Sequence, residues 1–307
     1  MKYLHLIGYK NLMLLVFAQF LFRFGFLKLN NIELALTNSQ YFLLVLATFL
    51  IGAGGNILHH ISAHETDIKN KTLAGHNVSE KTAYNFYFAC NIAGVLIGYY
   101  LSNIIQRPSF LVFFILIATL LYFYNVQLKK MILIGNIIIA FSTSFTILII
   151  GFFDLFPATD AANKAIMRTY FSILIDYSVM IFLITLIAEI IKDLIYLKND
   201  TLHKNKTLPV VIGAAKTKMT IALLTFVAII LIAVYINNYL INNQLIFATL
   251  YVLLLVVAPL VYVFIKIITA TATSDFYHLS AVLKWVFFFG IISVYIISKN
   301  INYNVAN

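Results

Sequence analysis

The sequence has very little charge. Only 10% of its 307 residues are Asp, Glu, Lys or Arg, whereas 62% are hydrophobic. A chain with so few polar side chains cannot cover the surface of a soluble domain of this length. The chain also has a single cysteine, Cys90, which excludes a disulfide within the chain and is expected to be a small core residue in an apolar run. The composition therefore predicts an integral membrane protein.

Acidic residues are scarcer than basic ones, 11 against 21, which gives a formal net charge of +10. The basic residues fall in short segments between apolar runs and form no stripe on a soluble face, so we expect no nucleic-acid partner. The first apolar run lacks a small-residue cleavage pattern and is expected to be a retained helix rather than a signal peptide.

Nine apolar runs, each close to the length that crosses a bilayer, follow one another along the chain. They cover residues 12–28, 41–58, 83–101, 109–127, 131–152, 169–191, 218–237, 244–265 and 282–298. About 20 residues of helix cross the hydrocarbon core, and backbone groups in lipid must bond within the segment. The sequence predicts an all-α polytopic membrane protein of about nine transmembrane helices, with residues 1–307 as a single domain.

Lysine and arginine counting predicts the orientation. With the N-terminus placed inside, the inner segments hold fifteen of these residues and the outer segments five, while Arg23 falls within the first run. Because cytoplasmic loops are enriched in Lys and Arg, we expect a cytoplasmic N-terminus and an outer C-terminus. Two ionisable clusters, in residues 59–67 and 189–200, then open to the cytoplasmic side.

Helical spacing places ionisable side chains of each cluster on one face. At about 100° per residue, His59 and His60 share an arc with Asp67, and the second face carries three carboxylates and Tyr196. Those carboxylates are Glu189, Asp193 and Asp200. Acidic side chains so close together are reasonable if they surround a cation such as Mg²⁺, with lysines neutralising a bound phosphate.

Other interpretations of these clusters remain open. Asp, Glu and Lys at helix ends also serve simply to solvate a membrane surface. The histidine pair His60 and His64, spaced i,i+4, could instead bind a softer metal such as Zn²⁺. A transporter is a further alternative, although these groups lie at helix ends rather than near the midplane, where transporters place their sites.

The order of the motifs is similar to that of a known family. Residues 59–67 read H-H-I-S-A-H-E-T-D before Asn70-Lys71-Thr72, and residues 192–200 read K-D-L-I-Y-L-K-N-D before K-T-L-P at 206–209. The chain resembles the UbiA-type intramembrane prenyltransferases, whose patterns are N-D-x-x-D-x-x-x-D with N-K-P, and K-D-x-x-D-x-x-G-D. Segments 79–84 and 124–130 and the pair Gly135-Asn136 are also typical of that family.

The resemblance implies nine helices around a central cavity, with the two motifs after helices two and six. It implies transfer of an isoprenoid chain from an allylic prenyl diphosphate, with Mg²⁺, to a small acceptor of the quinone-precursor, haem or glycerol-phosphate class. The lipid bilayer and a lipid or aromatic acceptor are then the partners. The implied metal and diphosphate ligands are Asp67, Asp193, Asp200 and Glu189. Implied to bind diphosphate are His59, His60, Lys192, Lys129 and Lys130, and to bind substrate, Asn11 and Tyr196.

Both motifs depart from the family pattern and are degenerate. The aspartates that remain are Asp67, Asp193 and Asp200. His59-His60 stand in place of Asn-Asp, and Ala63, Tyr196 and Thr72 replace two aspartates and a proline. Because neutral histidine is a poor ligand for Mg²⁺, a second hypothesis is a catalytically silent relative that binds an isoprenoid lipid or a partner.

Overall fold

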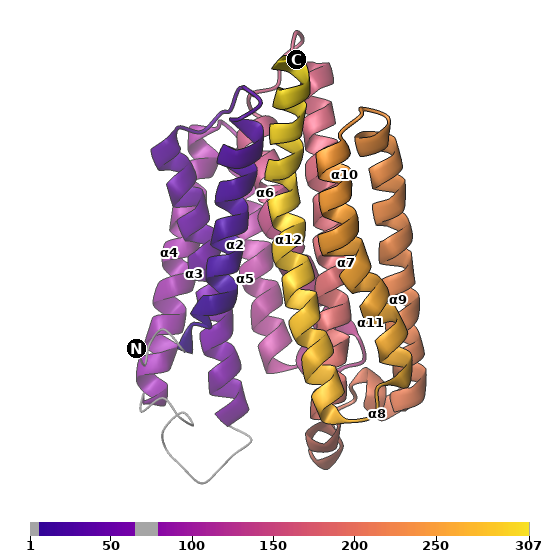
Figure 1. Cartoon of the computed structure of the whole chain (residues 1–307). Coiled ribbons are helices and arrows are strands. Elements are labelled where there is room, and N and C mark those ends of the chain that lie inside the picture. The colour runs from indigo at the N-terminus through magenta and orange to yellow at the C-terminus, as the bar shows by residue number, and fades with distance from the viewer. Residues whose placement is uncertain (1–5, 65–78, 307) are drawn as a thin grey trace. The chain divides into compact units, whose positions relative to one another are not determined.

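A computed structural model describes residues 6–64 and 79–306. In this part of the chain every regular element is helical (Figure 1), and several α-helices continue into short π-helical segments. The α-helices are α2 (Tyr9–Phe20), α3 (Asn38–His64), α4 (Glu80–Ile104), α5 (Leu111–Val126), α6 (Ile134–Ile150), α7 (Lys164–Leu202), α8 (Leu208–Ile212), α9 (Ala214–Tyr235), α10 (Ile246–Val252), α11 (Ala258–Thr269) and α12 (Thr273–Ala306). The π-helices are η1 (Leu21–Leu27), η4 (Gly151–Leu155), η5 (Ile236–Ile241) and η6 (Leu253–Val257).

Nine helical stretches in the described residues are long and apolar enough to cross a membrane, and each overlaps one predicted run. The all-helical, multi-pass prediction is therefore confirmed. Two or three consecutive elements supply most of the shorter spans, such as Tyr9–Leu27 from α2 and η1, and Ile246–Thr269 from α10, η6 and α11. Because the backbone stays helical through these junctions, its polar groups remain bonded within the span.

The chain divides into two compact units. The first comprises Met1–Gln19, Glu33–Lys129 and Ile149–Arg168, and the second Phe20–Ile32, Lys130–Leu148 and Thr169–Asn307. A single domain over residues 1–307 stays a prediction.

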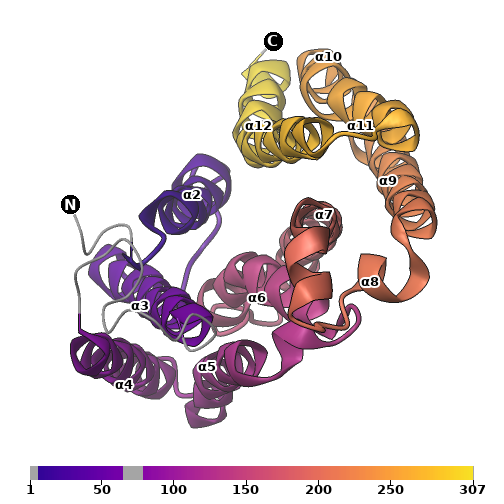
Figure 2. The same ribbon diagram turned by 90° about the horizontal axis from the view of Figure 1, so that it is seen from below.

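Close packing of α3 against α4 and α5 organises the first unit, and these helices lie side by side in Figure 2. Glycines allow the approach: a Cβ built at Gly94 would lie 2.8 Å from Ile51 Cγ1, and one at Gly98 would lie within van der Waals overlap of the Phe114 ring. The helix α4 begins at an N-cap, Ser79, whose hydroxyl accepts from the Thr82 N–H at 3.2 Å. Small residues thus set the distance between these helices.

The second unit packs α9 against α11 and packs α12 against α10, α11 and η1. Its core consists of buried aliphatic side chains such as Ile187, Ile190, Leu260 and Leu283. Gly213 separates α8 from α9 with a φ of +84°. Glycine suits this position because residues with a side chain rarely adopt such a positive φ. Figure 2 shows α9, α10, α11 and α12 gathered together.

The helix α7 is much longer than its apolar run. It has 39 residues, or about 58 Å at 1.5 Å per residue, whereas the hydrocarbon core is about 30 Å thick. The run predicted at residues 169–191 therefore marks only its apolar middle. The polar segment from Glu189 to Asp200 continues the same helix beyond it.

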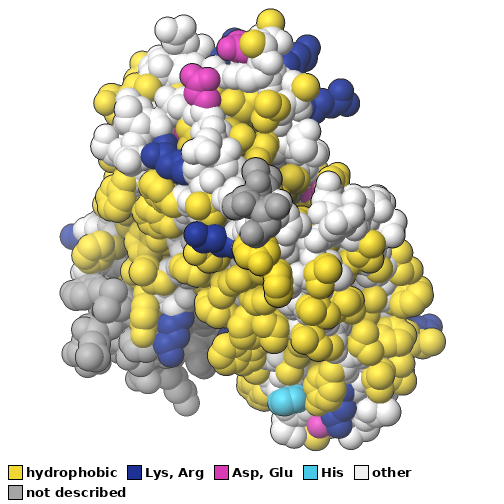
Figure 3. Space-filling view, turned by 45° about the horizontal axis from the view of Figure 1, so that its top comes forward, with side chains coloured by type: hydrophobic (Ala, Val, Ile, Leu, Met, Phe, Trp, Pro, Cys, Tyr) yellow, Lys and Arg dark blue, Asp and Glu magenta, His cyan; other side chains and the backbone are white. Residues whose placement is uncertain are grey.

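Large apolar side chains are exposed along the flanks of the spans. Examples are Met219, Leu223, Leu254 and Trp285, each more than half exposed. Figure 3 shows broad areas of hydrophobic side chains, with few charged ones, on the visible face. Apolar surface of this extent is typical of a chain surrounded by lipid.

Candidate functional site

The second ionisable cluster lies near the C-terminal end of α7, which is predicted to face the cytoplasm. Glu189, Lys192, Asp193, Tyr196 and Asp200 are all within this one helix, as their spacing predicted. Residues three or four apart on a helix are neighbours on its surface. The stripe of carboxylates is therefore a continuous feature of a single rigid element.

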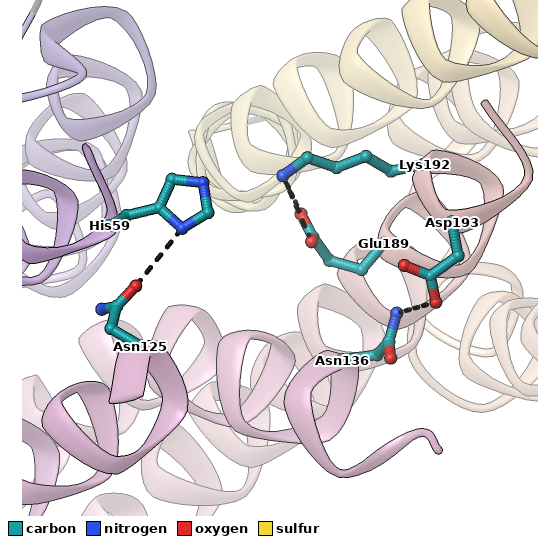
Figure 4. A network of polar contacts seen from close by, with 6 residues as sticks. All are labelled: His59, Asn125, Asn136, Glu189, Lys192 and Asp193. Atoms are coloured by element: carbon teal, nitrogen blue, oxygen red, sulfur yellow. Dashed lines mark hydrogen bonds and ion pairs between the residues drawn. The ribbon is translucent and has the colours of Figure 1, made fainter. Parts of the chain in front are cut away.

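An amide from the neighbouring helix holds Asp193. The Asn136 Nδ2 atom, in the first turn of α6, donates a hydrogen bond of 2.9 Å to Asp193 Oδ2 (Figure 4). Asp193 is half-buried and Asn136 is buried. A carboxylate oriented in this way keeps its second oxygen available for a cation or a donor.

Lys192 and Glu189 form an ion pair one helical turn apart. The Lys192 Nζ atom lies 3.4 Å from each of the two Glu189 carboxylate oxygens, and Figure 4 shows the lysine directed back toward Glu189. The Glu189 side chain is only 20% exposed, whereas that of Lys192 is 48% exposed. This places a positive and a negative charge beside Asp193.

Asp200 serves to close the loop that follows α7. Its Oδ1 accepts from Asn205 Nδ2 at 3.0 Å, and its Oδ2 accepts from the Thr207 hydroxyl at 3.1 Å. In the same loop the Lys206 N–H donates to the Lys130 carbonyl at 2.9 Å. The segments that contain Lys130 and Lys206, both similar to the family, are thus hydrogen-bonded to each other. Asp200 has a structural role in this loop, in addition to any role in binding a metal.

In the first unit, His59 is positioned by α5. The His59 Nδ1 and Asn125 Oδ1 atoms lie 3.3 Å apart, and Figure 4 shows the two side chains directed toward each other. The Asn125 Nδ2 atom donates to the Gly55 carbonyl at 3.0 Å and to the Leu121 carbonyl at 2.9 Å. The His60 ring centroid lies 6.1 Å from that of His59, and the Tyr124 ring stacks on the His59 ring with a centroid distance of 6.3 Å.

The remaining predicted site residues are less defined by contacts. Asn11 is exposed in the first turn of α2, and Tyr196 is 48% exposed on α7. Lys129 and Lys130 end the short helix η3 (Leu128–Lys130). Asp67 lies outside the described residues.

Convergence of the two clusters into one pocket, with the roles assigned to their residues, stays a prediction. Among residues 6–64 and 79–306, no group of three or more His, Cys, Asp and Glu side chains is close enough to hold a metal ion. The side chain of His64 is not described, so the predicted zinc pair cannot be placed.

The sequence reasoning assigned no role to Asn125 or Asn136, although both lie in segments similar to the family. Each is an isolated amide within or beside an apolar run, and each is at most 8% exposed. A polar side chain within a transmembrane helix usually faces a partner inside the protein, so this signal could have identified them.

Comparison with known proteins establishes the family of the chain. Residues 13–294 match the UbiA prenyltransferase family, which is nearly the full length of the chain. The chain therefore belongs to the UbiA prenyltransferase family.

Its curated relatives include two archaeal digeranylgeranylglyceryl phosphate synthases. The protein of Methanothrix thermoacetophila is 31% identical over 188 residues, which span 60% of this chain and 63% of the relative. That of Methanosphaera stadtmanae is 24% identical over 232 residues, which span 74% of this chain and 75% of the relative. The alignment with the first relative thus covers less than two thirds of its length.

Solved structures share the fold. A digeranylgeranylglyceryl phosphate synthase superposes with a TM-score of 0.65 at 20% identity and covers 95% of this chain and 97% of its own. A UbiA homologue from Archaeoglobus fulgidus, solved with GPP and Mg²⁺, has a TM-score of 0.59 at 13% identity, covering 96% of this chain and 99% of its own. The helical architecture of this chain is therefore that of UbiA proteins.

Proposed function

We propose that this protein transfers an isoprenoid chain from an allylic prenyl diphosphate to an acceptor of the glycerol-phosphate class. Membership of the family supports the reaction type, and the digeranylgeranylglyceryl phosphate synthases among its relatives support the acceptor. The structural observation that carries the proposal is Asp193, a half-buried carboxylate held by Asn136 beside Lys192 and Glu189.

The residues of α7 fit a Mg²⁺ ion that is shared with a diphosphate. Magnesium binds through one or two carboxylates together with substrate phosphates and water. Asp193 has an oxygen that Asn136 does not occupy, and Glu189 lies one turn away. Bound there, Mg²⁺ would neutralise charge on the departing diphosphate.

We assign the remaining roles by charge. Lys192 would attract the diphosphate, and His59 would do the same when protonated, with Asn125 fixing the position of its ring. Asp67 would complete the metal site from the first motif. This assignment requires that both motifs face one cytoplasmic cavity within a single domain, which we include in the proposal.

The test is transfer by the purified protein in lipid nanodiscs. Labelled geranylgeranyl diphosphate is incubated with Mg²⁺ and a glycerol phosphate that carries one ether-linked isoprenoid chain, and the lipid product is measured. We expect Mg²⁺-dependent product with the wild type and a loss of about 100-fold or more in kcat with Asp193→Asn, equivalent to about 3 kcal/mol. Glu33→Gln, at an exposed carboxylate, is the matched control and should keep full activity. Absence of Mg²⁺-dependent product, or equal rates in all three proteins, would refute the proposal.

A second candidate is a catalytically silent relative that binds an isoprenoid lipid. It is favoured by the side chains at the motif positions, where His59, His60, Ala63 and Tyr196 stand in place of Asn or Asp in the family pattern. Restoring the pattern with His59→Asn, His60→Asp, Ala63→Asp and Tyr196→Asp should then create turnover that the wild type lacks. Equal turnover before and after restoration would reject this alternative.

A further inference from the structure

A cavity that is open on one side lies in the second unit, between α7, α9, η6 and α12, away from the acidic stripe. Its volume is about 60 Å³, several times the roughly 10–15 Å³ that one water molecule needs. Most of its wall is aliphatic or aromatic, for example Met180, Ile184 and Phe287. Asp176, Tyr177, Tyr235 and Ser293 also line it.

The polar groups gather at one end of this cavity. The Tyr177 and Ser293 hydroxyls are 2.7 Å apart, which places this part of α7 beside the middle of α12. These two helices run in opposite directions (Figure 1), so Ile184 on α7 and Phe287 on α12 lie toward the other end. The cavity therefore has an apolar body and a polar end.

Among the described residues that line that end, Asp176 has a buried oxygen with an unmet hydrogen bond. Its Oδ2 atom is buried and has no hydrogen-bond partner among the described residues. The neighbouring hydroxyls are already engaged, since Ser293 donates to the Gly290 carbonyl at 2.6 Å and meets Tyr177. A buried acceptor left without a donor costs about 1–3 kcal/mol, so a ligand with a donor would recover that energy.

Gly290 keeps part of the cavity open. It lines the cavity, and a Cβ built on it meets no atom within 4 Å. A side chain at this position would therefore begin in open space and extend along the cavity wall. An ionisable residue within a transmembrane helix, facing an open space, usually marks a site with a function.

We propose that this cavity holds the hydroxyl end of an uncharged amphiphile: the terminal hydroxyl of an aliphatic or isoprenoid chain donates a hydrogen bond to Asp176, and the rest of the chain leaves through the open side. A volume of about 60 Å³ fits only the first few carbons of the chain, since a cavity that holds benzene has about 150 Å³. The apolar wall fits those carbons, and the free acceptor selects a donor. Phosphate and carboxylate head groups are excluded because they would place an anion against the Asp176 carboxyl group. The site is therefore distinct from the diphosphate site proposed on the distant end of α7.

The test uses geraniol as the probe and geranyl methyl ether, which has the same chain but no donor, as its match. Saturable binding of both to the purified protein in nanodiscs is measured with radiolabelled ligands. We expect the wild type to bind geraniol about tenfold more tightly than the ether, the ratio that one hydrogen bond of about 1.4 kcal/mol gives. Equal affinities would overturn the proposal.

Three variants locate the site. Asp176→Leu should abolish the preference for the alcohol, and Gly290→Leu should abolish saturable binding of both ligands. Ile175→Leu, at an exposed position on the same helix, should behave as wild type. Each variant is compared at equal recovery of monodisperse protein, and Gly290→Val replaces Gly290→Leu if the latter does not fold.

Two outcomes with these proteins separate this proposal from the proposed function. Geranyl diphosphate should not displace geraniol, and displacement with matching affinity would overturn the cavity assignment. Binding is measured without Mg²⁺ or acceptor, so a protein that fails to transfer prenyl groups still tests the cavity. Retained alcohol preference in Asp176→Leu would also overturn it.

Discussion

At the level of single residues, Asn136 and Asn125 each connect two helices of one unit through a side-chain amide. Asn136 connects α6 to Asp193 on α7, and Asn125 connects α5 to Gly55 and His59 on α3. Each amide thus orients a residue that we assign to the site, so each is a positioning residue whose removal can be measured.

Replacing Asn136 by leucine should weaken Mg²⁺ use in the proposed reaction. The substitution removes the hydrogen bond that orients Asp193, and loss of such a supporting contact typically costs 10- to 100-fold in metal affinity. We expect the Mg²⁺ concentration for half-maximal transfer to rise by about that factor, with a smaller change in kcat at saturating Mg²⁺. Ser144→Ala, on the same helix, is the control because the Ser144 hydroxyl donates to the Phe141 carbonyl of its own helix. An unchanged Mg²⁺ requirement would contradict the role given to Asn136.

Replacing Asn125 by leucine should destabilise the protein. The Asn125 side chain is 1% exposed and donates across to the Gly55 carbonyl, so its loss should cost about 1–3 kcal/mol. The measurement is the thermal unfolding midpoint in detergent. Asn103→Leu is the matched control, since the exposed Asn103 side chain donates to the Tyr99 carbonyl of its own helix. Equal shifts in both variants would show that the inter-helix bond contributes nothing.

At the level of elements, glycine sets the distance between α4 and α5. A Cβ at Gly98 would overlap the Phe114 ring, which is itself buried against Phe153. Gly98→Ala should therefore lower the free energy of unfolding by about 1–3 kcal/mol, the usual cost of overpacking.

The comparison is Gly290→Ala in α12, where the new methyl group enters open space. Alanine favours a helix by about 1 kcal/mol over glycine, so this variant should be neutral or more stable. Thermal unfolding of both proteins measures the difference. A Gly98→Ala protein as stable as Gly290→Ala would mean that α5 can shift freely.

The sequence located the helices well because a bilayer demands long apolar runs, and all nine predicted runs overlap spans in the described residues. It did not locate the π-helical segments, since residues such as those of η6 (Leu253–Val257) are equally suited to an α-helix. The apolar run at residues 169–191 is shorter than α7, because the charged residues past 191 weaken the hydropathy signal; the helical spacing of the acidic cluster, by contrast, already implied a helix as far as Asp200.

The candidate site was only partly predictable. Helical spacing alone put Glu189, Asp193 and Asp200 on one stripe, and the structure has them on one helix. The contacts of Asp200 with Asn205 and Thr207, and of Asp193 with Asn136, depend on how loops and helices pack. A periodic pattern within one segment contains no information on that packing.

At the level of the whole molecule, the orientation in the membrane stays a prediction that labelling can test. In a Cys90→Ala background, we expect a membrane-impermeant maleimide applied to intact cells to label Ala161→Cys, in a predicted outer loop. The same reagent should not label Thr201→Cys until the membrane is permeabilised, because this position lies at the end of α7 that is predicted to face the cytoplasm. Both positions are exposed in the structure. The reverse pattern would overturn the lysine and arginine argument.

The uninterrupted length of α7 has a mechanical consequence. Asp176 in the cavity and Asp193 in the acidic stripe are 17 positions apart on one α-helix, which is about 25 Å. A stiff rod transmits tilt and rotation between its ends, so any ligand that turns α7 at Asp176 also moves the carboxylates of the stripe. The two proposed sites thus lie on one rigid element, through which a movement at one of them would reach the other.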